Sequence, residues 1–265
     1  MKAGLTELVA PAHWRTLDFI SDLHLEASAP QTRAIWADYL AQTPADALFI
    51  LGDLFEVWVG DDQLGEEPAG FAALCAQSLA RAGEKLELFL MHGNRDFLMG
   101  ATLMQRCQAT LLADPCKLSA AGQHWLLSHG DALCLDDKPY MDFRRQVRSE
   151  VWQAQFLARP LPERQAIARQ IRQQSQQQLA LRSARGEGYA EVDTQAALSS
   201  LQQAGATTLI HGHTHRPARH ELAPGYVREV LSDWDAQAQP VRAQVLRLSL
   251  TAQGQAAGLQ RIDLH

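Results

Sequence analysis

The stretch ALFILGD, residues 47–53, joins an apolar run to a glycine–aspartate pair. The run Ala47–Leu51 has no polar residue, as expected of a strand that is buried on both faces. The strand predicted over Thr16–Ser21 ends in the same way, on Asp22-Leu23-His24. A helical pattern from about Thr32 to Ala41 separates the two runs. A strand, a helix and a second strand of this kind predict a layered α/β domain.

Three later runs repeat the arrangement, and a helical pattern over about Gly70–Ala82 precedes the first of them. The strand predicted over Leu86–Met91 leads to Gly93-Asn94-Arg95-Asp96, that over Trp125–Ser128 to His129-Gly130, and that over Thr207–Ile210 to His211-Gly212-His213. Side chains at the carboxyl ends of strands meet in the crevice beyond that edge of the sheet. A glycine beside four of the five motifs lets the backbone turn sharply there.

Together the five motifs offer two Asp, one Asn and four His side chains. This set of oxygen and imidazole ligands without thiolate suits Mn, Fe or Zn better than Ca or Mg alone. A single D-x-H is weak, and a single histidine is more often structural than a metal ligand. His215 follows closely and could donate a hydrogen bond behind the ligands. The motifs in this order predict a metal centre.

The composition is that of an ordinary soluble protein, with 46% hydrophobic and 20% charged residues. No run of 18 apolar residues occurs, which argues against a membrane-spanning helix. Met1–Trp14 lacks the apolar core of a secretory signal, and the four cysteines form no C-x-x-C pair, so we expect reduced, mostly buried thiols in a cytoplasmic protein. The net charge of −6 argues against nucleic-acid binding.

One segment differs from its surroundings. Lys138–Ala184 is rich in helix formers, is interrupted by Pro160 and Pro162, and places Trp152 and Phe156 four residues apart on an apolar stripe. Residues 138–185 hold ten Lys or Arg against three Asp or Glu, which suggests an anionic partner, although a solvated helical face is the alternative. We predict a helical cap over residues 138–185, inserted into a core made of residues 1–137 and 186–265. The tail, with alternation such as that of Gln244–Leu250, predicts antiparallel strands.

The order of the motifs resembles that of the calcineurin-like metallophosphoesterases, and the match runs from about Thr16 to His215. The resemblance implies an α-β-β-α sandwich and two metals, between which Asp53 is the bridging ligand. Its remaining ligands fall in two groups, Asp22, His24 and His213 for one metal, and Asn94, His129 and His211 for the other. Two such metals activate a water and stabilise both the attacking and the leaving oxygen.

Arg95 indicates which class of phosphate substrate the site hydrolyses. Many members of this superfamily carry a histidine at that position, which can protonate a leaving alkoxide. Arginine stays charged at any working pH and cannot serve as a general acid, but its planar fork binds phosphate. A pyrophosphate expels a phosphate monoester, which needs little protonation. Arg95 therefore favours a phosphoanhydride substrate.

Longer strings resemble the UDP-2,3-diacylglucosamine diphosphatases of lipid A biosynthesis. They are residues 51–58 (LGDLFEVW), 60–62 (GDD), 92–98 (HGNRDFL), 128–131 (SHGD) and 210–217 (IHGHTHRP). The resemblance implies hydrolysis of the substrate to lipid X and UMP by water attack at the α-phosphate, two Mn²⁺ ions, and work on the cytoplasmic face of the inner membrane. It implies no obligate protein partner.

The resemblance also implies roles for single residues. Direct catalytic roles fall to Asp53, Asn94 and His211. Substrate contacts fall to Asn94, Arg95, Asp137, Tyr140, Ser175, Arg182 and His211. The family has an Asn and a Lys after the position of Ser175, where this chain has glutamines. Arg182 or Arg185 would then take the place of the Lys, and the Asn has no clear counterpart.

The predicted cap fits a lipid substrate in two ways. Its apolar residues, Trp152, Phe156, Leu157, Leu161, Ile167 and Ile171, could line an acyl chamber. Its arginines, such as Arg144, Arg148, Arg164 and Arg172, suit an anionic bilayer surface. The alternative is that the apolar residues simply pack the cap onto the core.

Two other functions compete with this interpretation. The first is hydrolysis of a soluble phosphodiester, nucleotide sugar or phosphoprotein by the same fold, which would need neither an apolar stripe nor a basic cap. The second is a metal-free protein-binding scaffold of this fold. All seven ligand positions are filled, which disfavours the scaffold.

Overall fold

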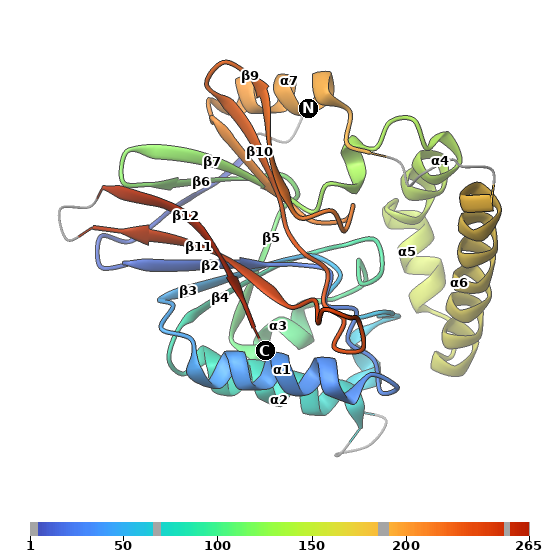
Figure 1. The fold of residues 1–265 in the computed structure, drawn as a ribbon. Coiled ribbons are helices and arrows are strands. Elements are labelled where there is room, and N and C mark those ends of the chain that lie inside the picture. The colour runs from blue at the N-terminus through green and yellow to red at the C-terminus, as the bar shows by residue number, and fades with distance from the viewer. Residues whose placement is uncertain (1–4, 66–69, 185–190, 252–254, 265) are drawn as a thin grey trace.

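The computed structural model describes residues 5–65, 70–184, 191–251 and 255–264. At residues 178–180 and 182–184 it describes the backbone and not the side chains. Two six-stranded sheets pack face to face (Figure 1). One contains, in spatial order, β12 (Ala256–Asp263), β11 (Gln244–Leu250), β2 (Thr16–Ile20), β3 (Ala47–Leu51), β4 (Glu87–Met91) and β5 (Ala109–Leu112). The other contains β1 (Thr6–Val9), β6 (Cys116–Ala120), β7 (Gln123–Ser128), β8 (Thr208–His211), β10 (Tyr226–Val230) and β9 (Ala218–Ala223).

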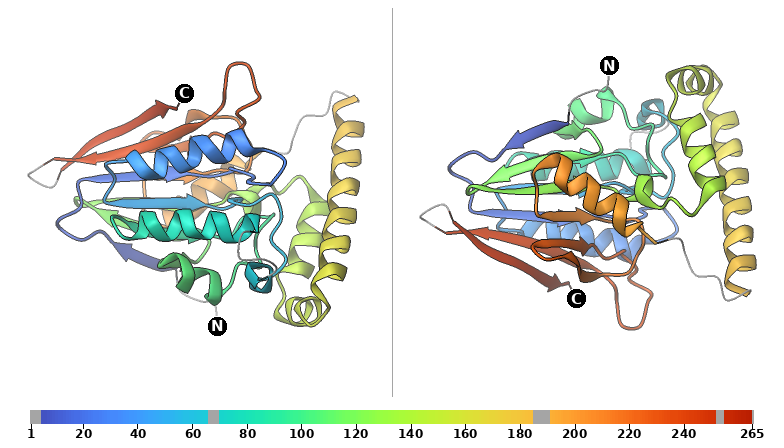
Figure 2. Two further views of the ribbon diagram at one scale, coloured as in Figure 1. Left: turned by 90° about the horizontal axis from the view of Figure 1, so that it is seen from below. Right: turned by 90° about the horizontal axis from the view of Figure 1, so that it is seen from above.

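Helices cover the outer face of each sheet, as Figures 1 and 2 show. Three lie against the sheet that contains β3, namely α1 (Pro30–Gln42), α2 (Phe71–Gly83) and α3 (Ala101–Cys107). The helix α7 (Thr194–Ala204) covers the other sheet. The predicted α-β-β-α sandwich is therefore confirmed.

Strand β3 shows why the sequence adopts these layers. All five of its residues are buried, and they alternate between two apolar cores. Phe49 packs between the sheets against Phe19 and Phe89, with ring centroids 5.0 and 4.9 Å away. Leu48 and Ile50 point to the opposite core, beneath the helices. A strand covered on both faces needs no polar residue, which accounts for the uninterrupted apolar run.

The parallel order β2-β3-β4 positions the motifs. Leu17 to Ile20 pair with Ala47 to Ile50, and Ala47 to Leu51 with Glu87 to Met91. The three strands therefore end at the same edge of the sheet, and β7 and β8 run parallel in the other sheet. The predicted strands are found within two residues of their expected bounds. The short strands β1, β5, β6 and β9 and the helices α3 and α7 were not predicted, because they lack a long apolar run or a clear stripe.

A helical segment lies beside the sandwich at the end where these strands stop (Figures 1 and 2). It consists of α4 (Lys138–Val147), α5 (Glu150–Leu157) and α6 (Leu161–Ala184). Pro160 separates α5 from α6, and Pro162 lies in the first turn of α6, where proline is tolerated. None of the described helices is both long and apolar enough to cross a membrane.

The apolar stripe of this segment packs on the core. Trp152 stacks on Phe156 with ring centroids 4.7 Å apart, and Phe156 is buried in the core beneath the helices. Trp152 also approaches Phe97, which follows β4, with centroids 6.2 Å apart. Leu161 and Ile167 pack against the same core. These four residues therefore pack the segment onto the core, which covers Phe156 and leaves Trp152, Leu161 and Ile167 partly exposed.

The expectation that four arginines of this segment face a bilayer is wrong, because each of them turns inward onto the core. Arg144 and Arg148 contact Asp131 and the Gly93 carbonyl oxygen, both at 2.8 Å. Arg164 pairs with Asp62 and Arg172 with Glu56. Acidic and carbonyl oxygens in the loops after the strands offer partners that the local sequence of the segment does not show. These arginines dock the segment.

Candidate metal centre

The motif residues lie in loops at the carboxyl ends of the central strands, and several have unusual backbone conformations. Non-glycine residues with positive φ are uncommon and cluster at functional sites. Here the positive values are those of Asp22 (53°), His24 (46°), Asp53 (52°), His213 (69°) and His215 (54°). The loops hold these residues in strained turns that aim their side chains into one place.

Two glycines allow the aspartate side chains of the site to approach the backbone closely. A Cβ atom on Gly93 would lie 2.0 Å from Asp53 Oδ1, and one on Gly212 would lie 2.2 Å from Asp22 Oδ2. No other residue fits at such separations. Glycine beside a motif permits a sharp turn. At these two positions the stronger requirement is the close approach of a carboxylate to the backbone.

One group of side chains converges around Asn94. The end of its amide lies 3.0 Å from His129 Nε2 and 2.9 Å from His213 Nδ1. Asp53 Oδ1 lies 3.7 Å from the same nitrogen of His129. Asp22, Asp53 and His129 each offer an atom within 4.8 Å of one another. Asp53 thus lies among ligands that the sequence analysis divided between two metals.

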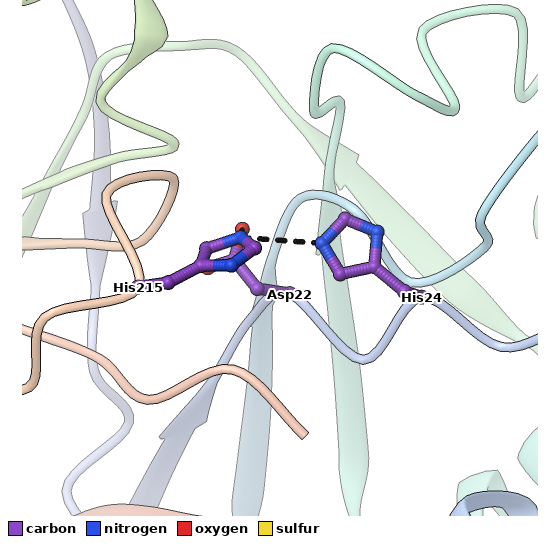
Figure 3. Close-up of side chains that lie close together, drawn as sticks. All are labelled: Asp22, His24 and His215. Carbon is purple, nitrogen blue, oxygen red and sulfur yellow. Dashed lines mark hydrogen bonds and ion pairs between the residues drawn. The ribbon is translucent and has the colours of Figure 1, made fainter. Parts of the chain in front are cut away.

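A second group lies around Asp22 (Figure 3). His215 Nε2 is 3.3 Å from Asp22 Oδ1 and 3.3 Å from His24 Nε2. His24 Nε2 is in turn 3.9 Å from Asp53 Oδ2. The family resemblance groups His213 with Asp22 and His24 and leaves His215 as a hydrogen-bond donor behind the ligands. In the structure the ring of His215 adjoins both, and the sign of this in the sequence was the spacing of His211, His213 and His215 at every second position.

The buried histidines present one ring nitrogen each. His129 Nδ1 lies 2.9 Å from the Leu51 carbonyl oxygen, and His211 Nδ1 lies 2.7 Å from that of Gly212. These contacts hold a proton on Nδ1 and leave a lone pair on Nε2. Among the described residues His211 Nε2 is buried without a hydrogen-bond partner. Buried polar atoms are rarely left without partners, so this nitrogen fits a metal ligand.

The charges around these side chains also suit a cation. Burial alone would raise the pKa of Asp22, but His215, His129 and His24 hold it well below its usual range. Burial opposes charge on His129, yet Asp53, Asp22 and Asp131 raise its pKa to about 9. A metal ion bound beside His129 would take the place of this proton on the ring. Burial, with Arg228 and His213 nearby, lowers the pKa of His211 to about 3, so this ring is neutral and ready to ligate.

Asp96 braces the site, and the sequence analysis gave it no role. Its carboxylate accepts hydrogen bonds from the backbone N–H groups of Gly93 and Leu54, both at 2.8 Å, and of Asp53 and Phe55, both at 3.3 Å. Burial, with Asp53 nearby, raises its pKa to about 6. Asp96 ties the loop after β4 to the loop after β3. Its place in the Gly93-Asn94-Arg95-Asp96 motif was the only sign in the sequence.

Arg95 and Tyr140 border the metal centre. The Arg95 backbone N–H donates to Asp53 Oδ1 at 2.8 Å, and its Nε lies 3.9 Å from Asp53 Oδ2. The Tyr140 hydroxyl donates to Asp131 Oδ2 at 2.5 Å, and its ring lies 6.0 Å from that of His213.

The other residues expected to contact substrate lie farther out or are not described. Asp137 caps the start of α4, where it accepts from the Tyr140 backbone N–H at 3.3 Å. Ser175 is exposed on α6. The side chain of Arg182 lies outside the described part of the chain, and so does Arg185.

Comparison with known proteins bears on the whole arrangement. The family model of the calcineurin-like phosphoesterases matches residues 15–217. A UDP-2,3-diacylglucosamine hydrolase from Cellvibrio japonicus is 45% identical over 237 residues, which cover 88% of this chain and 96% of the relative. One from Chromobacterium violaceum is 46% identical over 223 residues, covering 82% and 90%. A dimetal phosphatase from Danio rerio shares the fold, with a TM-score of 0.50 at 12% identity over 95% of this chain and 99% of that one.

Proposed function

The chain belongs to the calcineurin-like phosphoesterase family, and from this premise we propose that it hydrolyses the pyrophosphate bond of UDP-2,3-diacylglucosamine, giving 2,3-diacylglucosamine 1-phosphate and UMP. The observation that carries the proposal is the set of relatives with that activity in their names, which are 42–46% identical over more than 80% of the chain. The metal centre supports it, because the five motifs of a phosphoesterase converge at one edge of the sandwich.

The proposed ligands fall around Asp53, whose carboxylate approaches both groups of side chains. One metal would be held by Asp22 and His24 with His213 or His215, and the other by Asn94, His129 and His211. When bound, two divalent ions activate a water for in-line attack and stabilise the charge that develops on the phosphate. Of the metals that suit this donor set, we propose Mn²⁺ as the native one.

Arg95 is the proposed phosphate-binding group beside the metals. Its charge does not depend on pH, and its planar guanidinium can form two parallel hydrogen bonds to phosphate oxygens. It is held next to Asp53 by its own backbone N–H. The leaving group is a phosphate monoester, so no proton donor is required at this position. When water attacks the α-phosphorus, the new P–O bond forms in UMP, and the sugar phosphate leaves.

The helical segment is proposed to act as a cap over the substrate, with boundaries at residues 138 and 185. Its Trp152 and the neighbouring Phe97 are only half-buried, and Phe97 lies two residues from Arg95. They offer apolar surface close to the phosphate site, where an acyl chain would lie. The proposed place of action is the cytoplasmic face of the inner membrane, as the resemblance to the lipid A enzymes implies.

Two measurements test the proposal together. Hydrolysis of UDP-2,3-diacylglucosamine in ¹⁸O-labelled water should place the label in UMP. Plain UDP-N-acetylglucosamine should be hydrolysed with a specificity constant lower by orders of magnitude, because remote acyl contacts orient the pyrophosphate. Equal rates on both substrates would reject the lipid substrate and favour the soluble-substrate alternative. Label in the sugar phosphate would reject attack at the α-phosphorus.

A further inference from the structure

Glu56 joins the metal centre to the helical segment. It lies three residues after Asp53 in the loop that follows β3. Its Oε2 is 3.0 Å from His24 Nδ1, and its Oε1 pairs with Nε of Arg172 on α6. The side chains of Glu56 and His24 are each 17% exposed. One carboxylate therefore contacts a proposed metal ligand with one oxygen and the helical segment with the other.

His24 differs in this respect from two other proposed ligands. His129 and His211 are oriented by the carbonyl oxygens of Leu51 and Gly212. Those oxygens belong to the backbone at the ends of β3 and β8, so the sheets fix them. The Nδ1 of His24 faces a flexible side chain instead. The position of that side chain depends on a helix that packs from outside the sandwich.

We propose that Glu56 and Arg172 are positioning residues for the metal held by Asp22 and His24. Arg172 holds the carboxylate of Glu56, and Glu56 holds the His24 ring with Nε2 toward Asp22 and Asp53. The affinity of this metal then depends on the contact between Arg172 and Glu56. The inference rests on the two-metal part of the proposed function and not on the lipid substrate.

The physical basis is the effect of a carboxylate behind a ligating histidine. Such a partner fixes the ring orientation and raises the basicity of the ligating nitrogen, and its loss typically costs about 10–100-fold in metal affinity. Coupling between two events is reciprocal, so metal binding must stabilise the contact between Arg172 and Glu56 by the same factor by which that contact strengthens metal binding. The second metal has no such connection through Glu56, so changes at Glu56 or Arg172 should leave its affinity unchanged.

Arg164 provides a matched control. It is also an arginine of α6 that pairs with an acidic residue of the core, Asp62, and it is 2% exposed. It bonds the Val59 carbonyl oxygen as well, so it also holds α6 against the core. No contact connects Asp62 to a proposed ligand in the described part of the chain. Arg164→Met should therefore loosen α6 without changing the coordination of the metal.

The experiment is a titration of the metal-free protein with Mn²⁺, followed by calorimetry and electron paramagnetic resonance. The wild type should bind two ions and give the signal of an exchange-coupled pair. Glu56→Gln should weaken one site by about 10–100-fold and leave the other unchanged, so that the signal of isolated Mn²⁺ precedes that of the pair. Arg172→Met should shift the same site in the same direction, and Arg172→Lys should shift it less.

Hydrogen exchange of α6 supplies a second readout. Mn²⁺ should slow exchange in the amides of α6 in the wild type, and this effect should be smaller in Arg172→Met. Far-ultraviolet circular dichroism of each metal-free variant checks that it is folded. If a variant is not folded, Arg172→Lys decides the outcome, because lysine keeps the positive charge and lacks only the planar guanidinium.

Three results would overturn the inference. Wild-type affinities at both sites in Glu56→Gln or in Arg172→Met would remove the connection through Glu56. An equal loss of affinity in Arg164→Met would show that general loosening of the helix is the cause. A wild-type protein that binds fewer than two Mn²⁺ ions would reject the two-metal function as well, which separates the failure of the function from the failure of the inference alone.

Discussion

Arg148, at the end of α4, donates a hydrogen bond from Nη2 to the carbonyl oxygen of Gly93 across 2.8 Å. Its guanidinium also lies 5.1 Å from the centre of the Phe97 ring. Gly93 and Phe97 flank Asn94 and Arg95, which carry an expected metal ligand and the expected phosphate contact. The helical segment therefore holds the turn that presents both residues, although it contributes no proposed metal ligand.

Replacing Arg148 with Met should lower kcat/KM on the pyrophosphate substrate by roughly 10-fold or more. A hydrogen bond from a charged donor is worth about 1.5–3 kcal/mol, and here it fixes the turn that orients Arg95. Steady-state kinetics measures the effect. Arg145→Met is the control on the same helix, because Arg145 is 78% exposed and pairs with Asp142, its neighbour on the helix surface. Equal losses in the two variants would contradict this role for Arg148.

Asp53→Ala and His211→Ala should each abolish activity while leaving the fold intact. Asp53 approaches ligands of both proposed metals, and the buried Nε2 of His211 has no hydrogen-bond partner in the described part of the chain. Removal of either changes the coordination that activates the attacking water. Turnover and metal content should be measured on the same preparations. If Asp53→Ala keeps more than a few per cent of wild-type turnover, the two-metal assignment is wrong.

Arg95→Lys should lose most of the activity although it keeps the positive charge. Lysine lacks the planar fork that binds two phosphate oxygens at once. Arg95→His should not restore hydrolysis, because the phosphate leaving group needs no acid. Both variants retain the backbone N–H that bonds Asp53, so the metal centre should stay intact and bind its metal normally. An Arg95→His enzyme as active as the wild type would contradict the argument from the leaving group.

The cysteines should not react with a thiol reagent at pH 8 while the protein is folded. All four are buried thiols outside any disulfide, in line with the sequence-based expectation. Burial raises the pKa of Cys75, Cys107 and Cys134 to about 12. A pKa raised on folding contributes stability below the unfolded pKa, near 9, and the contribution is lost as the pH rises toward 12.

The reaction of the cysteines with a chromogenic disulfide reagent can be followed by absorbance. The folded protein in buffer should show almost no reaction, and the protein unfolded in denaturant should show four reactive thiols. Urea unfolding at rising pH should show stability falling above pH 9. Rapid labelling of a cysteine in the folded protein would indicate that its part of the core opens, contrary to the burial of its thiol.

The sequence by itself determined the layers and most of the metal centre. The run Ala47–Leu51 can be stable only when covered on both sides, which implies a sheet between two apolar cores. The motifs after such runs had to meet at one edge, because parallel strands end together. The order of strands and motifs along the chain is therefore enough to place Asp22, Asp53, Asn94 and His129 in one site.

Only the tertiary structure decided how the helical segment meets this site and which histidines lie together. Arginine side chains at Arg144, Arg148, Arg164 and Arg172 have the same local pattern whether they face a bilayer or the core. Their partners are Asp131, the Gly93 carbonyl oxygen, Asp62 and Glu56, which all lie outside the helical segment. The place of His215 beside Asp22 and His24 follows from positive φ angles in two separate loops. Pairings of this kind depend on how loops from different strands approach one another, and short-range periodicity carries no information about that.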